Sequence, residues 1–118
     1  MPRVTERSSG LRLYEIAAQN RWVIPAFCAE NLTTMEAVFA AAKDHADTLG
    51  RRDIPVSVAI TNLYSHRSQT LNYTNSGSWE TGLRLFLADI EVLCSPPSPY
   101  ADLSVMVHLD HVQHDRDA

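Results

Sequence analysis

The chain has 118 residues, of which 45% are hydrophobic and 20% charged, and its formal net charge is −4. These values are ordinary for a soluble globular protein, and they exclude the strongly basic surface that nucleic-acid binding requires. The polar start, "MPRVTERSSG", holds no apolar signal-peptide core, and no later apolar run is long enough to cross a bilayer. The two cysteines have no CxxC spacing, which favours reduced thiols in a cytoplasmic protein.

The amino-terminal part of the chain predicts a helix followed by a buried strand. Residues 11–19, "LRLYEIAAQ", carry apolar side chains at roughly helical spacing after a cap-like Ser-Ser-Gly stretch. Residues 22–27, "WVIPAF", form a short apolar run with β-branched and aromatic side chains, which is typical of a buried strand.

A second helix is predicted over residues 31–50, "NLTTMEAVFAAAKDHADTLG". Thr33 or Thr34 can cap its start, Glu36 is placed in its first turn, and Gly50 suits the position just after its end. The apolar face of this helix consists of Met35, Val38, Phe39 and Ala42.

The remainder of the chain predicts two more strands and a third helix. Residues 54–60, "IPVSVAI", read as a buried strand, and the polar residues 61–78 as a long loop. Residues 79–94 form an amphipathic pattern that "SPPSPY" at 95–100 ends, because proline lacks an N–H donor and disfavours helix before it. Residues 103–111, "LSVMVHLDH", are apolar until their last few positions, which predicts a third strand.

Helices that alternate with near-continuous apolar strands predict an α/β fold with a parallel sheet covered on both faces. Ligands of such sheets bind at the carboxyl ends of the strands. Each predicted strand turns polar at that end, with "CAEN", "TNLYSH" and "HLDH" in turn. The carboxyl edge of the sheet is therefore the predicted site.

The last residues, "HLDHVQHDRDA", are dense in groups that bind metals or move protons. His108 and Asp110 share a face of a regular strand, whereas the adjacent Asp110 and His111 reach one site only if the backbone turns there. His108, His111 and His114 could form a three-histidine metallohydrolase site with Asp115, although this spacing does not obviously converge. Surface histidines, a phosphohydrolase "HD" pair and a helix-capping Asp115 are the other interpretations.

Three segments, "VIPAFCAENLTTMEAV", "PVSVAITN" and "VMVHLDH", together resemble the amino-terminal part of the class II, metal-dependent fructose- or tagatose-bisphosphate aldolases. The resemblance covers about residues 11–118, in order and with sensible spacing. That family folds as a (β/α)8 barrel with its active site at the carboxyl ends of the strands. The resemblance thus implies about three β/α units of a TIM barrel.

The resemblance also implies roles for individual residues. Asp110 matches the catalytic aspartate that handles the proton on the oxygen of the aldehyde half. His111 matches the first of three histidine ligands of a zinc ion that polarises the dihydroxyacetone-phosphate carbonyl. His108 would be a neighbour that orients the site, and Thr61 and Asn62 match a Ser/Thr-Asn pair near the substrate.

Two residues depart from the family's pattern. Cys28 stands where the family commonly has an asparagine near the substrate, and a thiol lacks the paired donor and acceptor of an amide. Val112 stands where glycine is frequent. Either change is compatible with an altered substrate or an inactive paralogue. For Cys28 we favour a small buried hydrophobic role over a reactive one.

A complete barrel of this type needs roughly 250 residues, so we interpret residues 1–118 as a single incomplete domain. The expected parent protein is a lyase of carbohydrate metabolism, of the glycolytic aldolase type, which acts on a phosphorylated ketose and forms a homo-oligomer. The other zinc ligands would lie outside this chain, and we expect no nucleic-acid or membrane partner. The alternative is a catalytically silent, aldolase-derived module that acts through subunit association.

Overall fold

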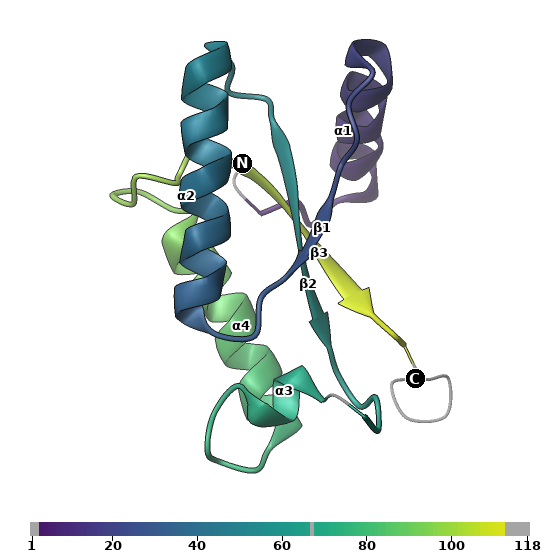
Figure 1. Cartoon of the computed structure of the whole chain (residues 1–118), viewed down its shortest axis with the longest axis vertical. Helices are drawn as coiled ribbons and strands as arrows, with labels where there is room; N and C mark the ends of the chain where they lie inside the picture. The colour runs from purple at the N-terminus through teal and green to yellow at the C-terminus, as the bar shows by residue number, and fades with distance from the viewer. Residues whose placement is uncertain (1–2, 67, 113–118) are drawn as a thin grey trace.

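A computed structural model describes residues 3–66 and 68–112. Its strands form a parallel sheet in the order β1-β2-β3, and helices alternate with them along the chain (Figure 1). This confirms the predicted α/β class, as an open sheet with no barrel closure among the described residues. The elements in chain order are α1 (Arg7–Asn20), β1 (Ala26–Cys28), α2 (Leu32–Leu49), β2 (Pro55–Thr61), α3 (Gln69–Asn72), α4 (Trp79–Leu93) and β3 (Ser104–Asp110).

The core lies between one face of the sheet and helices α2 and α4. Alternate residues of β2, together with Val105 of β3, point to this helix-covered face, because side chains on a strand alternate between its two sides. They meet apolar side chains of α2 and α4 that are withdrawn from water, and this burial is the main source of stability. The core residues are Ala29, Met35, Phe39, Val56, Val58, Ile60, Phe86, Ile90, Cys94, Leu103 and Val105.

The opposite face of the sheet is covered unevenly: every residue of β2 is buried, as the predicted covering of both faces requires, but β1 and β3 are partly exposed on this face. The register aligns Cys28, Ala59 and His108 in one row across this open face. Ala59 is buried, but Cys28 and His108 are exposed. Figure 1 shows α1 on the other side of the strands from α2 and α4, and no residue of α1 belongs to the core cluster.

Helix α2 begins one residue after its cap. Asn31, not Thr33 or Thr34 as predicted, is the N-cap, and its side-chain oxygen accepts a hydrogen bond of 2.8 Å from the N–H of Thr34. Asparagine suits this position because its short amide satisfies a free N–H of the first turn. Glu36 lies beyond that turn, contrary to the prediction. Gly50 ends the helix with φ of 63°, the left-handed conformation in which glycine is favoured, as predicted.

Helix α1 and strand β1 differ in extent from the prediction. Helix α1 begins at Arg7, so the Ser-Ser-Gly stretch expected to precede it lies inside its first turns. Strand β1 is three residues long, from Ala26, whereas a strand over 22–27 was predicted. Pro25 has no N–H to donate to a ladder, and only the residues after it pair with β2.

The segment predicted as a continuous loop over 61–78 contains the short helix α3. Helix α4 then begins after Ser78, whose hydroxyl accepts a hydrogen bond of 3.1 Å from the N–H of Thr81. Gly82 lets the two helices approach closely, since a Cβ atom there would lie 1.8 Å from the backbone oxygen of Thr70. Helix α4 ends at Leu93, immediately before the proline-rich stretch that was expected to end it.

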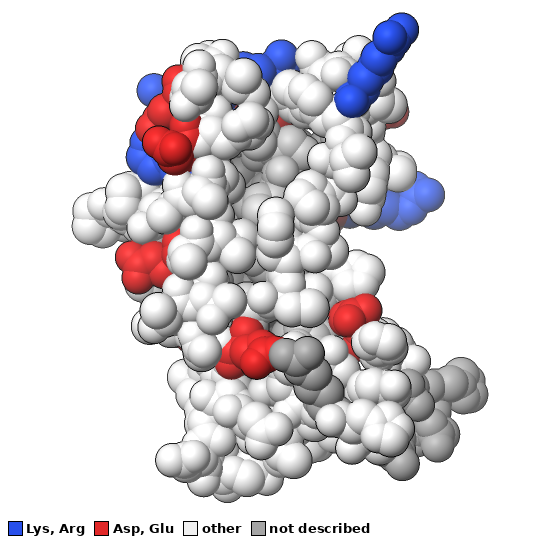
Figure 2. All heavy atoms as spheres, in the orientation of Figure 1, with Lys and Arg blue, Asp and Glu red and all other residues white. Residues whose placement is uncertain are grey.

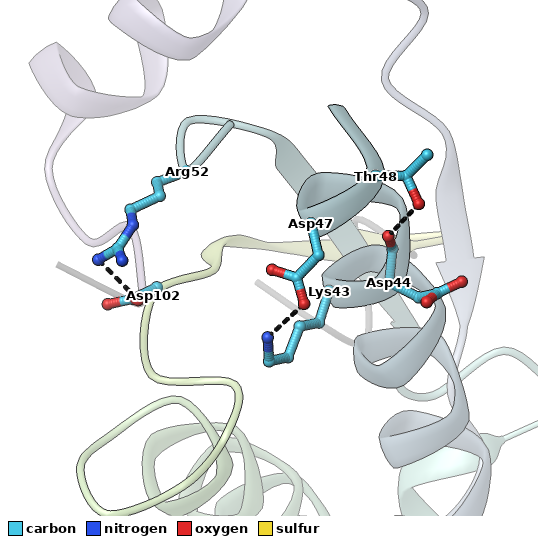
Figure 3. Close-up of polar contacts among 6 residues, drawn as sticks. All are labelled: Lys43, Asp44, Asp47, Thr48, Arg52 and Asp102. Carbon is cyan, nitrogen blue, oxygen red and sulfur yellow. Dashed lines mark hydrogen bonds and ion pairs between the residues drawn. The ribbon is translucent and has the colours of Figure 1, made fainter. Parts of the chain in front are cut away.

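Exposed ion pairs gather at the amino ends of β2 and β3 (Figure 3). The Nη1 atom of Arg52 lies 3.2 Å from Oδ2 of Asp102. On α2, the Lys43 ammonium forms an ion pair with the carboxylate of Asp47, one helical turn further along. A hydrogen bond from the Arg51 guanidinium lowers the pKa of Asp53. Exposed pairs of this kind contribute little to stability, so this end of the sheet is a solvated surface with paired charges.

No helix within residues 3–66 and 68–112 combines the length and the apolar character that a membrane crossing requires.

Candidate functional site

The candidate site lies at the carboxyl ends of β2 and β3. The parallel register pairs Ala59 with His108 and Thr61 with Asp110, so these residues share the open face of the sheet. The predicted common face of His108 and Asp110 is therefore confirmed. Strand β3 ends at Asp110, where its side chain is half-buried.

The backbone turns sharply at His111, as the sequence required for two adjacent side chains to meet. His111 has φ of 51°, a left-handed conformation that is uncommon for a residue other than glycine. This turn brings the His111 Nε2 atom to 3.6 Å from Asp110 Oδ2. The imidazole also stacks on the ring of Tyr64, with centroids 4.6 Å apart and planes at 14°. We call Tyr64, His108, Asp110 and His111 the carboxyl-edge cluster.

In this cluster one carboxylate lies between two imidazoles. His108 Nε2 is 3.8 Å from Asp110 Oδ1, on the other side of the carboxyl group from His111. Both separations exceed a direct hydrogen bond, so the Asp110 oxygens keep acceptor capacity for another group. The side chains of His108, Asp110 and His111 are 52%, 36% and 57% exposed, which leaves them accessible to a ligand. A carboxylate flanked by imidazoles can exchange protons with a bound hydroxyl.

The described residues contain no group of three histidine, cysteine, aspartate or glutamate side chains that could hold a metal ion. The imidazoles of His108 and His111 approach different oxygen atoms of Asp110, so the three side chains do not converge on a common metal position. His111 nevertheless offers one accessible imidazole, which fits one position of a zinc site. His114 and Asp115, which the metallohydrolase interpretation needs, lie outside the described residues.

Thr61 and Asn62 are buried at the end of β2, next to the cluster. The N–H of Thr61 donates a hydrogen bond of 2.9 Å to Gln69 Oε1, and the Thr70 hydroxyl donates one of 2.7 Å to Asn62 Oδ1. Gln69 Nε2 in turn donates to the Glu30 carboxylate at 3.1 Å. This polar network ties the ends of β1 and β2 to α3, and the role of Thr61 and Asn62 toward a substrate stays a prediction.

Helix α3, which the sequence did not predict, is held in place by α4. Tyr73, just after α3, packs edge-on against Phe86, with ring centroids 6.0 Å apart, and its hydroxyl donates to the Asp89 carboxylate. Burial, and then this hydrogen bond, raises the pKa of Tyr73. The aromatic side chain of Tyr73, inside the predicted polar loop, was the sequence signal for this anchor. Helix α3 is thus anchored to α4 through Tyr73.

The two cysteines are both free thiols, as predicted, but differ in environment. Cys94 is fully buried at the end of α4, and burial raises its pKa to about 12. Cys28 is exposed, so its interpretation as a small buried hydrophobic residue is wrong. It is exposed at the edge of the sheet, where β1 has a neighbouring strand on one side only among the described residues.

An apolar groove of about 720 Å³ borders the free edge of β1. Figure 2 shows the middle of this side of the molecule as uncharged and hollowed, with charged side chains around its rim. Phe27 and Val23 are exposed along the groove, although both are apolar. The groove is lined by Arg21, Trp22, Val23, Pro25, Phe27, Thr34, Ala37, Val38, Ala41, Ala42, His45, Ile54, Pro55 and Val56.

No protein-family model, no curated protein and no solved structure matches this chain. The resemblance to the class II aldolases therefore stays a prediction carried by the residues themselves.

Proposed function

We propose that this chain carries part of the active site of a class II, zinc-dependent ketose-bisphosphate aldolase built on a (β/α)8 barrel. The observation that carries the proposal is the turn at His111, which gathers the histidine and Asp110 at the carboxyl ends of parallel strands. This edge of a parallel α/β sheet is where ligands generally bind. The expected substrate is a phosphorylated ketose.

In the proposed reaction Asp110 moves the proton of the aldehyde half. During cleavage its carboxylate accepts the proton of the substrate hydroxyl as the carbon–carbon bond breaks and the aldehyde forms. In the direction of synthesis the same group, now a carboxylic acid, returns that proton to the oxygen. The accessible carboxylate without a direct hydrogen bond to either imidazole supports this role.

His111 would hold the zinc ion with two further ligands from outside the described residues. When bound, zinc supplies Lewis-acid polarisation of the substrate carbonyl. His108 would orient Asp110 from the other side, and Thr61 and Asn62 would line the substrate pocket from the end of β2.

The apolar groove beside β1 also supports a barrel. In a barrel every strand has two neighbours and helices cover the outer surface. The free edge of β1 and the exposed Phe27 fit the place where a further strand and helix would pack.

At the outer edge of β3, the N–H of Val4 donates a hydrogen bond of 2.8 Å to the Val105 oxygen. A fourth strand on that side would have to replace this bond.

The proposal is tested by zinc competition against a chromophoric chelator, together with an aldol cleavage assay, on the 118-residue chain. We expect weak zinc binding that His111→Ala abolishes, and no turnover of a ketose bisphosphate. His114→Ala is the matched control, because it should leave zinc affinity unchanged. Loss of binding in His114→Ala but not in His111→Ala would contradict the proposal and favour the metallohydrolase interpretation.

A second candidate is a catalytically silent module that associates with another subunit, and the apolar groove beside the unpaired edge of β1 favours it. Exposed strand edges invite pairing with another chain. Sedimentation separates the two candidates. A single well-defined oligomer that forms without metal, and that His111→Ala leaves unchanged, supports the silent module, whereas a zinc-dependent assembly supports the aldolase.

A further inference from the structure

We infer that the free edge of β1 pairs with the same edge of a second copy of this chain, in antiparallel register about Phe27. The inference rests on the second candidate function, association with another subunit, and names that subunit. All three residues of β1, Ala26, Phe27 and Cys28, are exposed, and none of them is charged. Strands of a parallel sheet are normally buried, so this edge is an unpartnered surface.

The two edges of the sheet differ in how far they are occupied. At the outer edge of β3, Arg3 forms a parallel bridge with Val105, and the N–H of Val4 donates a hydrogen bond of 2.8 Å to the Val105 oxygen. No described strand lies beyond β1. Charged side chains usually protect an edge strand from pairing, and β1 has none. The edge of β1 is therefore the one that is bare along its whole length, and pairing of this edge with itself gives a closed twofold dimer.

The backbone groups that β1 presents at this edge suit antiparallel pairing. The N–H of Ala29 donates to the Ala59 oxygen at 3.1 Å, so Phe27, two residues earlier, also directs its N–H and C=O toward β2. The N–H and C=O groups of Ala26 and Cys28 therefore point to the free edge. With a twofold axis at Phe27, Ala26 of each copy faces Cys28 of the other, and each such pair exchanges two hydrogen bonds.

The side chains beside this edge are self-complementary in the same register. Phe27 points to the helix-covered face, as its partner Val58 does, and is 44% exposed. It lines the apolar groove of about 720 Å³, whose other wall is α2 (Figure 2). The twofold axis places the Phe27 rings of the two copies opposite each other, in a pair without hydrogen bonds, where side chains come closest. Both rings are then withdrawn from water beside the two grooves.

The charges that flank β1 are opposite in sign. Arg21 precedes the strand and is exposed, and Glu30 follows it. Antiparallel pairing brings the amino end of one β1 beside the carboxyl end of the other, so Arg21 of each copy comes to the end that carries Glu30 of the other. The Glu30 carboxylate accepts a hydrogen bond of 3.1 Å from Gln69, which leaves its negative charge in place. This charge complementarity favours a second copy of the chain as the occupant of the edge.

Sedimentation equilibrium of the 118-residue chain with a chelator, over a range of concentrations, tests the inference. We expect a single dimer, which Phe27→Lys should weaken about 100-fold or more, because two ammonium groups would then face each other across the axis. Phe27 lies outside the core cluster, so this variant should keep the circular dichroism of the unsubstituted chain. Arg21→Glu should weaken the dimer several-fold. Arg84→Glu, the same charge change at an exposed position of α4, is the control that should leave it unchanged.

Disulfide trapping tests the register. In a Cys28→Ala background, Phe27→Cys should form an interchain disulfide under mild oxidation, because the two positions lie opposite each other within reach of that bond. In the unsubstituted chain, Cys28 of one copy lies diagonal to Cys28 of the other, at about 7–8 Å, and should not form a disulfide across the interface.

A monomer throughout the concentration range overturns the inference. A dimer that Phe27→Lys leaves unchanged also overturns it, as does an interchain Cys28 disulfide without trapping at position 27. The second candidate function fails on a different observation, an assembly that needs zinc and is lost in His111→Ala. The two failures are therefore separate.

Discussion

The two faces of the sheet differ in which side chains they carry and in how far these are exposed to water. On the helix-covered face, Val58, Phe39 and Phe86 are fully withdrawn from water in a continuous apolar core. On the open face, the row of Cys28, Ala59 and His108 ends in exposed side chains that can react or bind. The same strands carry both sets, because alternate residues point to opposite sides. One face of the sheet therefore stabilises the fold, while the other holds the candidate chemistry.

The largest effect is expected from shortening a core side chain on the helix-covered face. Phe39→Ala should lower the free energy of unfolding by about 3–5 kcal/mol, because it removes buried contacts and leaves a cavity. Phe27→Ala, at a phenylalanine that is 44% exposed beside the groove, should cost about 1 kcal/mol. Urea unfolding followed by circular dichroism measures both. Equal losses would show that the groove is as tightly packed as the core.

A smaller effect is expected where α3 approaches α4. Gly82→Ala should destabilise the fold by about 1–3 kcal/mol, because the added methyl group would overlap the backbone oxygen of Thr70 and displace α3. Gly10→Ala is the matched control. Its new Cβ would lie 3.8 Å from a Val4 methyl group, an ordinary contact, and alanine in a helix should stabilise the fold by about 0.5–1 kcal/mol. A neutral Gly82→Ala would refute the close approach of the two helices.

The two thiols give the smallest and most local contrast. Near neutral pH, Cys28 should react quickly with a disulfide reagent and Cys94 only on unfolding, because one is exposed and the other buried. Burial raises the Cys94 pKa to about 12 from an ordinary value of 9.0. Its contribution to stability is therefore complete below pH 9 and lost as the pH rises toward 12.

Cys94→Ala, followed by urea unfolding across this alkaline range, should lose this part of the pH dependence, whereas Cys28→Ala should keep it. Rapid reaction of both thiols in the folded chain would contradict the buried environment of Cys94.

The sequence predicted what depends on local pattern. The apolar runs of β2 and β3, the left-handed Gly50 and the need for a turn after Asp110 were all visible as spacing or residue type. Helix α3 was missed because it is only four residues long, three of them polar, and so carries no periodic signal. Packing against α4 holds this helix in place, because Gly82 has no side chain and lets the backbone of Thr70 approach closely.

The stack of Tyr64 on His111 was missed for a similar reason. It joins two strand ends that are distant in sequence, and only the register of the sheet brings them together. The exposure of Cys28 also follows from the free edge of β1, which no local pattern reports.

The central claim is that His111, at the carboxyl edge of the sheet, is a metal ligand. Its most direct test is NMR of the histidine rings during addition of paramagnetic cobalt(II) to the 118-residue chain. The His111 ring resonances should broaden first, those of His108 next, and those of His45 on α2 last. Broadening that begins at His45, or that spares His111 when cobalt is bound, would contradict this claim.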